Sequence, residues 1–223
     1  RGVFSNLWIN GHHKAYFNLT ERLREPFFQR HYETDAEWDI WHIREIVEGD
    51  RIHYDATMNL LRNQPMSVDT NYAAAEARVD MANYIDYIIT NIYGATGDWP
   101  HNNYNLSRPR IDGGRWTFNV WDAEGSFGHF GNNINTNTLT EALGGSPSGD
   151  SHMSRLVYRA CKSNAEFRLL FADRINQHFF NDGGLTQTNL SRIFSEVYAE
   201  FEPIYRAVRG SQPDRRYFDN WLP

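Results

Sequence analysis

The amino-acid sequence predicts a single α+β domain over residues 1–223, with a small β portion at its beginning and a largely helical second half. Three features lead to this prediction. Residues 6–22 have the pattern of a β-hairpin, residues 81–92 repeat apolar side chains at helical spacing, and the chain is again helical in pattern from about residue 151. A chain of 223 residues is long enough to bury one sizeable core, and no internal repeat indicates a second one.

The first expected element is the hairpin NLWINGHHKAYFNLTER, whose Asn10-Gly11 dipeptide favours a two-residue primed turn. Two short helices are expected in REPFFQRHY and YDATMNLLRN. Between them, AEWDIWHIREIV is expected to be an extended or edge segment.

The middle of the chain predicts a buried helix followed by two strands. The helix is VDMANYIDYIITNIYG, which places one apolar face at three- and four-residue steps and ends at the glycines of YGATG. YNLS and RWTFNVWD then have the residues of two strands, joined by the turn RIDGG.

The last third predicts a polar loop and then helices. GNNINTNTLTEALGGSPSGDS is rich in Gly, Asn and Ser and is expected to be a loop. SRLVYRACKSN is helical in pattern, and Ser163 with Glu166 is expected to form a capping box before the next helix. One more long helix is expected over residues 190–208.

Composition argues against some classes of partner. The chain has 22 basic and 28 acidic residues and a formal net charge of -6, which argues against nucleic acid or an anionic membrane as the main partner. No apolar run is long enough to span a bilayer. Cys161 is the single cysteine, so a disulfide within the chain is excluded, and we expect a buried, unreactive thiol. Because the chain begins at Arg1 without a methionine, we expect it to be part of a larger polypeptide.

The chemistry-bearing residues gather in the central stretch, Gly97 to Gly128. Asp98 follows the predicted buried helix, Asn103 comes five residues later, and Asp122 ends the second strand. Oxygen ligands of this kind favour magnesium, manganese or calcium over zinc. In phosphoryl transfer, such a set supplies a base for the attacking hydroxyl and two metal ligands. The spacing alone is also compatible with turn caps and Asx-turns.

Several neighbouring side chains allow two interpretations. Glu124 is either a further metal ligand or a solvated carboxylate. His12 and His13 are adjacent in a strand and therefore face opposite sides, which argues against a shared metal. His101 and Asn102 lie between the key residues, where contact with phosphate or substrate is a weaker prediction. For three tryptophans a sugar-stacking platform is one interpretation and a place in the core is the favoured one: Trp99, Trp116 and Trp121.

Three blocks of the sequence together resemble the CotH (spore coat protein H) kinase family. They are INGHHKAYFNLTER, the stretch YIDYIITNIYGATGDWPHNNYNL with WTFNVWDAEGSFG, and SRLVYRACKSNAEFRLLFADRINQHFFNDGGLT, in the family's order and over most of the chain. The resemblance implies an atypical protein-kinase-like fold that uses ATP and Mg or Mn. It implies Asp98 as the catalytic aspartate, and Asn103 and Asp122 as the metal ligands that also bind the cofactor.

The sequence departs from the general kinase plan near its beginning. It has no glycine-rich phosphate loop, so the fold is expected to be truncated at the N-terminus, with a partial small-lobe β region at 1–48 and a large lobe at 49–223. Lys14 and Lys162 are the only lysines, and neither lies where a phosphate-binding lysine is expected. Arg44 lies in the region where such a base would be sought. Glu21 is the candidate partner of that base, with a surface ion pair as the alternative.

Two main functions follow, and the sequence leaves both open. The first is a protein kinase that phosphorylates Ser or Thr hydroxyls of a protein substrate. The second is a catalytically inactive pseudokinase that acts as a binding or structural module. A metal-dependent hydrolase has no distinctive support in the sequence. The resemblance further implies an extracellular location or one at a cell or spore surface.

Overall fold

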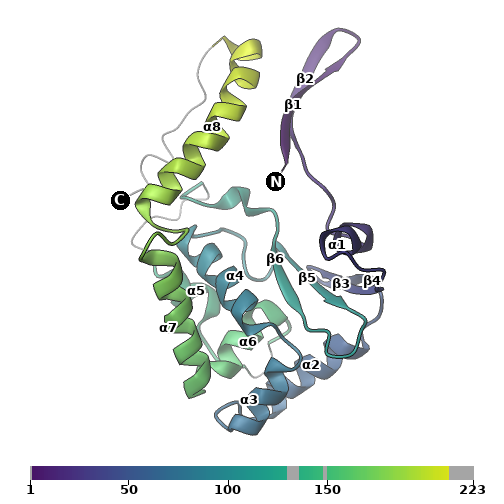
Figure 1. Cartoon of the computed structure of the whole chain (residues 1–223), viewed down its shortest axis with the longest axis vertical. Helices are drawn as coiled ribbons and strands as arrows, with labels where there is room; N and C mark the ends of the chain where they lie inside the picture. The colour runs from purple at the N-terminus through teal and green to yellow at the C-terminus, as the bar shows by residue number, and fades with distance from the viewer. Residues whose placement is uncertain (1, 130–135, 148–149, 211–223) are drawn as a thin grey trace. The chain divides into compact units, whose positions relative to one another are not determined.

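The computed structural model describes residues 2–129, 136–147 and 150–210, in which the chain forms eight α-helices and two small antiparallel sheets (Figure 1). The predicted α+β class is confirmed. The chain divides into two compact units, Leu23–Ile175 and a second unit that joins Arg1–Arg22 to Asn176–Pro223. The predicted lobes, residues 1–48 and 49–223, stay a prediction. No helix in the described ranges has both the length and the hydropathy needed to cross a bilayer.

The second unit contains the predicted hairpin. β1 (Val3–Ile9) and β2 (His12–Leu19) pair antiparallel. Asn10 and Gly11 have φ values of 51° and 76°, as a primed turn requires, so the predicted hairpin is confirmed. The long helix α8 (Gln187–Arg209) contacts β1.

Aromatic side chains make much of the contact between α8 and the hairpin. Phe4 and Phe201 have ring centroids 5.1 Å apart, and the rings of Tyr16 and Tyr205 stack at 5.3 Å. None of the helix's residues is fully buried. The helix is therefore held by stacked and tilted contacts between aromatic rings and not by insertion into a core.

The larger unit is built on a four-stranded sheet with the order β4-β3-β5-β6, in which every neighbouring pair is antiparallel. Its strands are β3 (Trp38–His42), β4 (Glu45–Glu48), β5 (Tyr104–Pro109) and β6 (Thr117–Val120). The two strands predicted on either side of RIDGG are therefore confirmed as β5 and β6.

The extended or edge segment predicted for AEWDIWHIREIV is confirmed as extended, and its second strand, β4, lies at the edge of the sheet. This segment forms two strands, and β3 lies inside the sheet between β4 and β5. Trp38, Asp39, Ile40 and Trp41 are all less than 5% exposed, so both faces of β3 are covered. A strand covered on both faces has no polar–apolar alternation that would distinguish it in a sequence.

α4 (Met81–Tyr93) forms the centre of the core, as its apolar periodicity predicts. Its N-terminus is capped by Asp80, whose Oδ1 accepts a hydrogen bond from Asn83 N at 3.1 Å. The ring of Tyr84 lies 4.8 Å from that of Phe118 on β6. Of the predicted face, Ile92 is half-buried and the other members are buried: Met81, Tyr84, Ile85, Ile88 and Ile89.

The remaining helices of the larger unit surround α4 and the sheet. They are α1 (Glu25–His31), α2 (Ile52–Asn63), α3 (Asp69–Glu76), α5 (Thr138–Leu143), α6 (Met153–Cys161) and α7 (Ala165–Phe179), which crosses the boundary between the units. The helices predicted at REPFFQRHY, YDATMNLLRN and SRLVYRACKSN are confirmed as α1, α2 and α6. Cys161 is fully buried, and burial raises the pKa of its thiol to about 12, as expected of an unreactive cysteine.

One of these helices has no counterpart among the predicted elements, and two local predictions are corrected. α3 was not predicted, because it is short and buries only Tyr72 and Ala75. α5 lies in the segment predicted as a loop, where Asn137 Oδ1 caps it by accepting from Thr140 N at 3.0 Å. Residues 130–135 and 148–149 of that predicted loop lie outside the described residues. The capping box at Ser163 is wrong: a neighbouring asparagine provides the side-chain cap of α7.

Asn164 is that asparagine. Its Oδ1 accepts hydrogen bonds from Glu166 N at 2.8 Å and from Phe167 N at 3.2 Å. Its Nδ2 donates to the carbonyl oxygen of Met66 at 3.0 Å. The side chain is buried and needs these partners, which is why Asn164 displaces Ser163 from the capping role.

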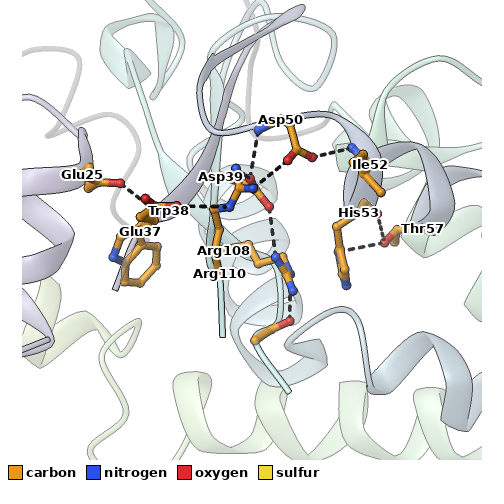
Figure 2. A network of polar contacts seen from close by, with 11 residues as sticks. Glu25, Glu37, Trp38, Asp39, Asp50, Ile52, His53, Thr57, Arg108 and Arg110 are labelled. Atoms are coloured by element: carbon orange, nitrogen blue, oxygen red, sulfur yellow. Dashed lines mark hydrogen bonds and ion pairs between the residues drawn. The ribbon is translucent and has the colours of Figure 1, made fainter. Parts of the chain in front are cut away.

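A buried carboxylate connects β3 to β5 and to the beginning of α2 (Figure 2). Asp39 accepts hydrogen bonds from Arg108 Nη1 at 3.0 Å and from Arg110 Nη1 at 3.3 Å. Asp39 Oδ1 also accepts from Asp50 N at 3.0 Å, and Asp50 Oδ1 accepts from Ile52 N, the first residue of α2, at 2.9 Å. The network therefore fixes where α2 begins relative to the sheet.

Gly49 is required beside this network. It has a φ of 76°, and a Cβ built there would lie 2.2 Å from Asp39 Oδ1. We expect Gly49→Ala to lower the free energy of unfolding by about 3 kcal/mol, because the positive φ costs about 1 kcal/mol and the methyl group displaces a buried, paired carboxylate. Urea denaturation measures the loss.

Gly113→Ala is the matched control for this substitution. Gly113 has a similar φ of 72°, and a Cβ there would meet no atom within 4 Å. Gly113→Ala should therefore lower the free energy of unfolding only by the backbone contribution, about 1 kcal/mol. Equal losses in the two variants would show that the contact with Asp39 contributes nothing.

Candidate active site

The register of the sheet brings three chain segments to one end. β3 ends where β5 begins, since His42 pairs with Asn105, and β6 ends there too, since Val120 pairs with Tyr104. The residues just beyond these strand ends are the Ile43–Arg44 turn, Asn103 and the Trp121–Asp122 segment. The rings of His42 and Trp121 lie 5.1 Å apart, which joins two of the segments directly. Asn103, Asp122 and the turn that carries Arg44 are thus grouped by topology.

Asp98 lies in the loop between α4 and β5. Its Oδ1 lies 3.1 Å from His101 Nε2 and accepts a hydrogen bond from Asn102 Nδ2, also at 3.1 Å. Both contacts converge on one oxygen, and the other, Oδ2, accepts no hydrogen bond from the described residues. The side chain is 49% exposed. Asp98 is therefore oriented by its neighbours and keeps one oxygen accessible to an incoming proton donor.

Hydrogen bonds join the Asp98 loop to the loop that follows Asp122. Gly97 N donates to the carbonyl oxygen of Gly125 at 3.0 Å, and Phe127 N donates to that of Gly94 at 2.7 Å. The hydroxyl oxygens of Thr96 and Ser126 lie 2.9 Å apart. These contacts connect the residues just before Asp98 to the end of the 3-10 turn η1 (Ala123–Gly125) and the residues after it. The two loops are therefore held together by hydrogen bonds.

Asn103 binds directly to the segment that carries Asp122. Its Nδ2 donates to the Asp122 carbonyl oxygen at 3.1 Å. Since only the amide nitrogen can donate to a carbonyl group, the amide oxygen of Asn103 is the atom left for a ligand. The contact bridges 19 residues of sequence and joins the Asn103 side chain to the backbone of Asp122.

Unusual backbone conformations concentrate at this site. Ten described residues other than glycine have a positive φ, and six of them lie in its loops: Ile43, Ala95, Asp98, Asn103, Asp122 and Phe127. Asn and Asp tolerate this region, whereas it is costly for the β-branched Ile43. The turn at Ile43 is held by the hydrogen bond from its N–H to the Tyr104 carbonyl oxygen at 3.1 Å. Such strain clusters at functional sites, where the surrounding structure enforces it.

A second carboxylate lies beside Asp122. A hydrogen bond with the Asp122 carboxyl group raises the pKa of Glu124, with a smaller contribution from burial. Two acidic groups this close repel one another when both are ionised, and a divalent cation relieves that repulsion. In the described part of the chain, no group of three or more His, Cys, Asp or Glu side chains is arranged for a metal. A site of this kind must therefore complete its ligands with the Asn103 amide oxygen, water and phosphate.

The other predicted residues lie in different places. Arg44 is exposed on the turn at the same end of the sheet as Asn103 and Asp122. Glu21 follows β2 in the other unit, and its role stays a prediction. Trp99 and Trp116 are buried in the core, as favoured, whereas Trp121 is half-buried at the site.

For His101 and Asn102 the sequence supports only a weak prediction of contact with phosphate or substrate. In the structure they hold the Asp98 carboxylate. Their positions three and four residues after Asp98 are the sequence feature that could have predicted these contacts, because polar side chains at these offsets meet within a turn. The pairing of Thr96 with Ser126 spans 30 residues and had no local signal.

The family comparison adds to this geometry. The model of the family described as CotH kinase protein matches residues 2–220. The chain belongs to the CotH kinase protein family. No curated protein and no solved structure matches it. Membership of the CotH family implies a kinase-like fold, and ATP and metal as the general cofactors of kinases.

Proposed function

We propose that this CotH-family chain is a metal-dependent protein kinase that transfers the γ-phosphoryl group of ATP to Ser or Thr hydroxyls of a protein substrate. The observation that carries the proposal is the hydrogen bond from Asn103 to the Asp122 carbonyl group. It joins the side chain of Asn103 to the backbone of Asp122, and further hydrogen bonds join the loop after Asp122 to the loop that carries Asp98, which supports a shared site. A base, an amide ligand and a carboxylate ligand are the protein groups that phosphoryl transfer requires.

The residues present fit a divalent metal. Asn103 Oδ1 and the Asp122 carboxylate are hard oxygen ligands, and Glu124 supplies a further carboxylate two residues after Asp122. When bound, Mg or Mn supplies charge neutralisation at the phosphates of ATP. The chain's own part is to present these oxygens in a fixed arrangement, because both ligand-bearing loops are hydrogen-bonded to each other.

Asp98 is proposed as the base that accepts the proton of the substrate hydroxyl. His101 and Asn102 fix its Oδ1, and Oδ2 is the oxygen free to accept a proton. Asp98 also lines a cavity of about 220 Å3 together with Arg155 of α6, where the hydroxyl-bearing residue can enter. Arg44 is proposed as a cofactor-binding residue, because its turn shares the sheet end with both metal ligands.

The test of the metal site is Asp122→Asn. We expect it to weaken ATP binding in the presence of Mg by at least about tenfold, since one charged ligand is lost. Calorimetric titration of ATP with Mg, and then with Mn, into the parent chain and the variant measures this change. The change in affinity should disappear when the metal is chelated.

Asp112→Asn is the control, because Asp112 is an exposed aspartate in the turn between β5 and β6. Titrations of Asp122→Asn that superimpose on those of the parent chain would remove Asp122 from the metal site. ATP binding without transfer to any hydroxyl would instead favour the pseudokinase.

A further inference from the structure

A second, larger cavity lies in the same unit as the candidate active site. It has a volume of about 690 Å3 and lies between the β3–β4 turn, α2 and the residues that precede α6. Cavities of this size are typical of ligand sites. Neither Asp98 nor the two proposed metal ligands line it. Of the residues proposed above for catalysis or for ATP, only Arg44 lines it, so the cavity is distinct from the proposed site of transfer.

The charge in this cavity is positive, although the chain as a whole carries -6. Its lining includes Arg44, Arg51 and Arg62, against the single carboxylate of Asp55. Asp55 pairs with Arg51 through two hydrogen bonds, at 3.0 and 3.3 Å. Burial lowers the pKa of His152, which is therefore neutral near pH 7. Three guanidinium groups against one carboxylate leave two positive charges.

The guanidinium group of Arg62 is bound by a neutral group, a backbone carbonyl. Its Nε and Nη2 donate to the backbone carbonyl oxygen of Asp150 at 2.9 and 2.5 Å. The Asp150 carboxylate does not compensate it, because this side chain is fully buried against Arg155 and Arg159. Arg62 is thus held in place while its Nη1 donors remain for a ligand.

Arg51 is also held in place. Its guanidinium carbon lies 5.3 Å from the centre of the Trp41 ring, and its Nε and Nη2 bind Asp55. The Nη1 donors are again left over. Guanidinium groups fixed in this way lose little conformational entropy on binding, and they suit the geometry of a phosphoryl group.

The aromatic side chains of the cavity do not offer a stacking surface for a nucleotide base. Trp41 and Tyr54 stack on each other, with centroids 3.8 Å apart and an interplanar angle of 1°. These two rings and that of Tyr104 are at most 4% exposed. The groups in this cavity that a ligand can contact are therefore mainly the cationic side chains.

The cavity adjoins the candidate active site. Tyr104, in its wall, follows Asn103 directly, and its hydroxyl oxygen lies 3.3 Å from His152 Nδ1. Two residues after His152, Ser154 Oγ donates to the carbonyl oxygen of Pro100, in the Asp98 loop, at 2.7 Å. The cavity and the Asp98 loop are therefore joined by direct contacts, so that one substrate peptide can extend from the cavity to Asp98.

We propose that this arginine cavity, defined by Arg51, Arg62 and His152 and bordered by the proposed cofactor-binding residue Arg44, binds a phosphoserine or phosphothreonine of the protein substrate. The phosphoryl group is bound by the Nη1 groups of Arg51 and Arg62, and the peptide continues toward Asp98. This proposal rests on the proposed kinase function and gives it a substrate class, namely peptides that already carry one phosphate.

The test uses a blocked Gly-phosphoserine-Gly peptide, titrated calorimetrically into the chain without nucleotide. We expect the phosphorylated peptide to bind, and Arg51→Gln and Arg62→Gln each to weaken it by about tenfold or more. Arg192→Gln is the matched control: like the Arg51–Asp55 pair, the Arg192–Glu196 pair has i,i+4 spacing, and the two arginine side chains are 57% and 58% exposed. It should leave peptide binding unchanged.

Several outcomes would overturn the proposal. They are no binding of the phosphopeptide to the folded chain, equal effects of Arg51→Gln and Arg192→Gln, or binding of inorganic phosphate as tight as that of the peptide. If Arg62→Gln lowers the thermal stability, the exposed Arg51→Gln variant still decides the matter.

Titration of ATP with Mg into the same variants separates the cavity from the nucleotide site. We expect Arg51→Gln and Arg62→Gln to bind ATP as the parent chain does. Equal weakening of ATP and phosphopeptide binding would assign the cavity to the nucleotide and overturn the proposal. Failure of the kinase proposal looks different, because ATP and Mg then bind equally to the parent chain and to Asp122→Asn, whatever the peptide does.

Discussion

Asp98→Asn is expected to lower phosphoryl transfer by about a hundredfold to ten-thousandfold, the usual range for loss of a general base, while the affinity for ATP with Mg stays at the parent value. The carboxylate acts on the substrate hydroxyl and not on the nucleotide. The amide keeps the shape of the side chain and can still meet Asn102, so the loop is preserved. Transfer is measured as label incorporated from γ-labelled ATP into the chain itself and into an added model protein.

His101→Ala is a second variant that tests how Asp98 is oriented. Its ring nitrogen contacts Asp98 Oδ1, whereas Oδ2 is the proposed proton acceptor. We expect a smaller loss of transfer, about tenfold, since the base remains but is less well oriented. Label incorporation that survives Asp98→Asn at the parent rate would remove Asp98 from the role of base. A parent chain that binds ATP with Mg and transfers no label would be a binding module.

Local patterns in the sequence were sufficient to predict much of the fold. The Asn10-Gly11 turn and the periodicity of α4 are set by neighbouring residues, and both are present as predicted. Asp98, Asn103 and Asp122 were selected for residue type and for positions after a helix or a strand. The structure places Asn103 against the backbone of Asp122 and joins the loop after Asp122 to the loop that carries Asp98 and Asn103, which the spacing alone could not establish.

Contacts between residues distant in sequence explain what was missed. β3 lies inside the sheet because it pairs with β5, and the pairing is reinforced by Asp39 and Arg108, which are 69 residues apart. The arginine cavity likewise combines residues from β3, α2, β5 and the segment before α6. No single segment contains a repeated pattern for either feature, so each becomes visible only once the chain is folded.

The second large effect is expected for Asp150, a buried carboxylate that joins three helices. Its Oδ1 accepts from Arg155 Nη2 at 3.1 Å and from His152 N at 3.0 Å, and its Oδ2 accepts from Arg159 Nη1 at 2.7 Å. Arg159 also donates to the carbonyl oxygen of Leu143 at the end of α5, at 3.3 Å. Because the Asp150 carbonyl group binds Arg62 of α2, one residue connects α2, α5 and α6.

Asp150→Ala is expected to lower the free energy of unfolding by about 3–5 kcal/mol, because two arginines that are largely buried lose their shared counter-charge. For a chain of this length, such a loss corresponds to a fall in Tm of about 10 °C. Thermal and urea unfolding measure both quantities. Asp150→Asn should lose less, since an amide oxygen can still accept from the N–H of His152.

Asp112→Ala provides the exposed comparison and should change stability by less than about 0.5 kcal/mol. If Asp150→Ala unfolds like Asp112→Ala, the buried ion network does not hold the three helices together. If it is destabilised as expected, phosphoryl transfer should fall as well at temperatures where the variant is still folded. The reason is that α6, which Asp150 orients, binds the Asp98 loop through Ser154 and supplies Arg155 to the cavity beside the base.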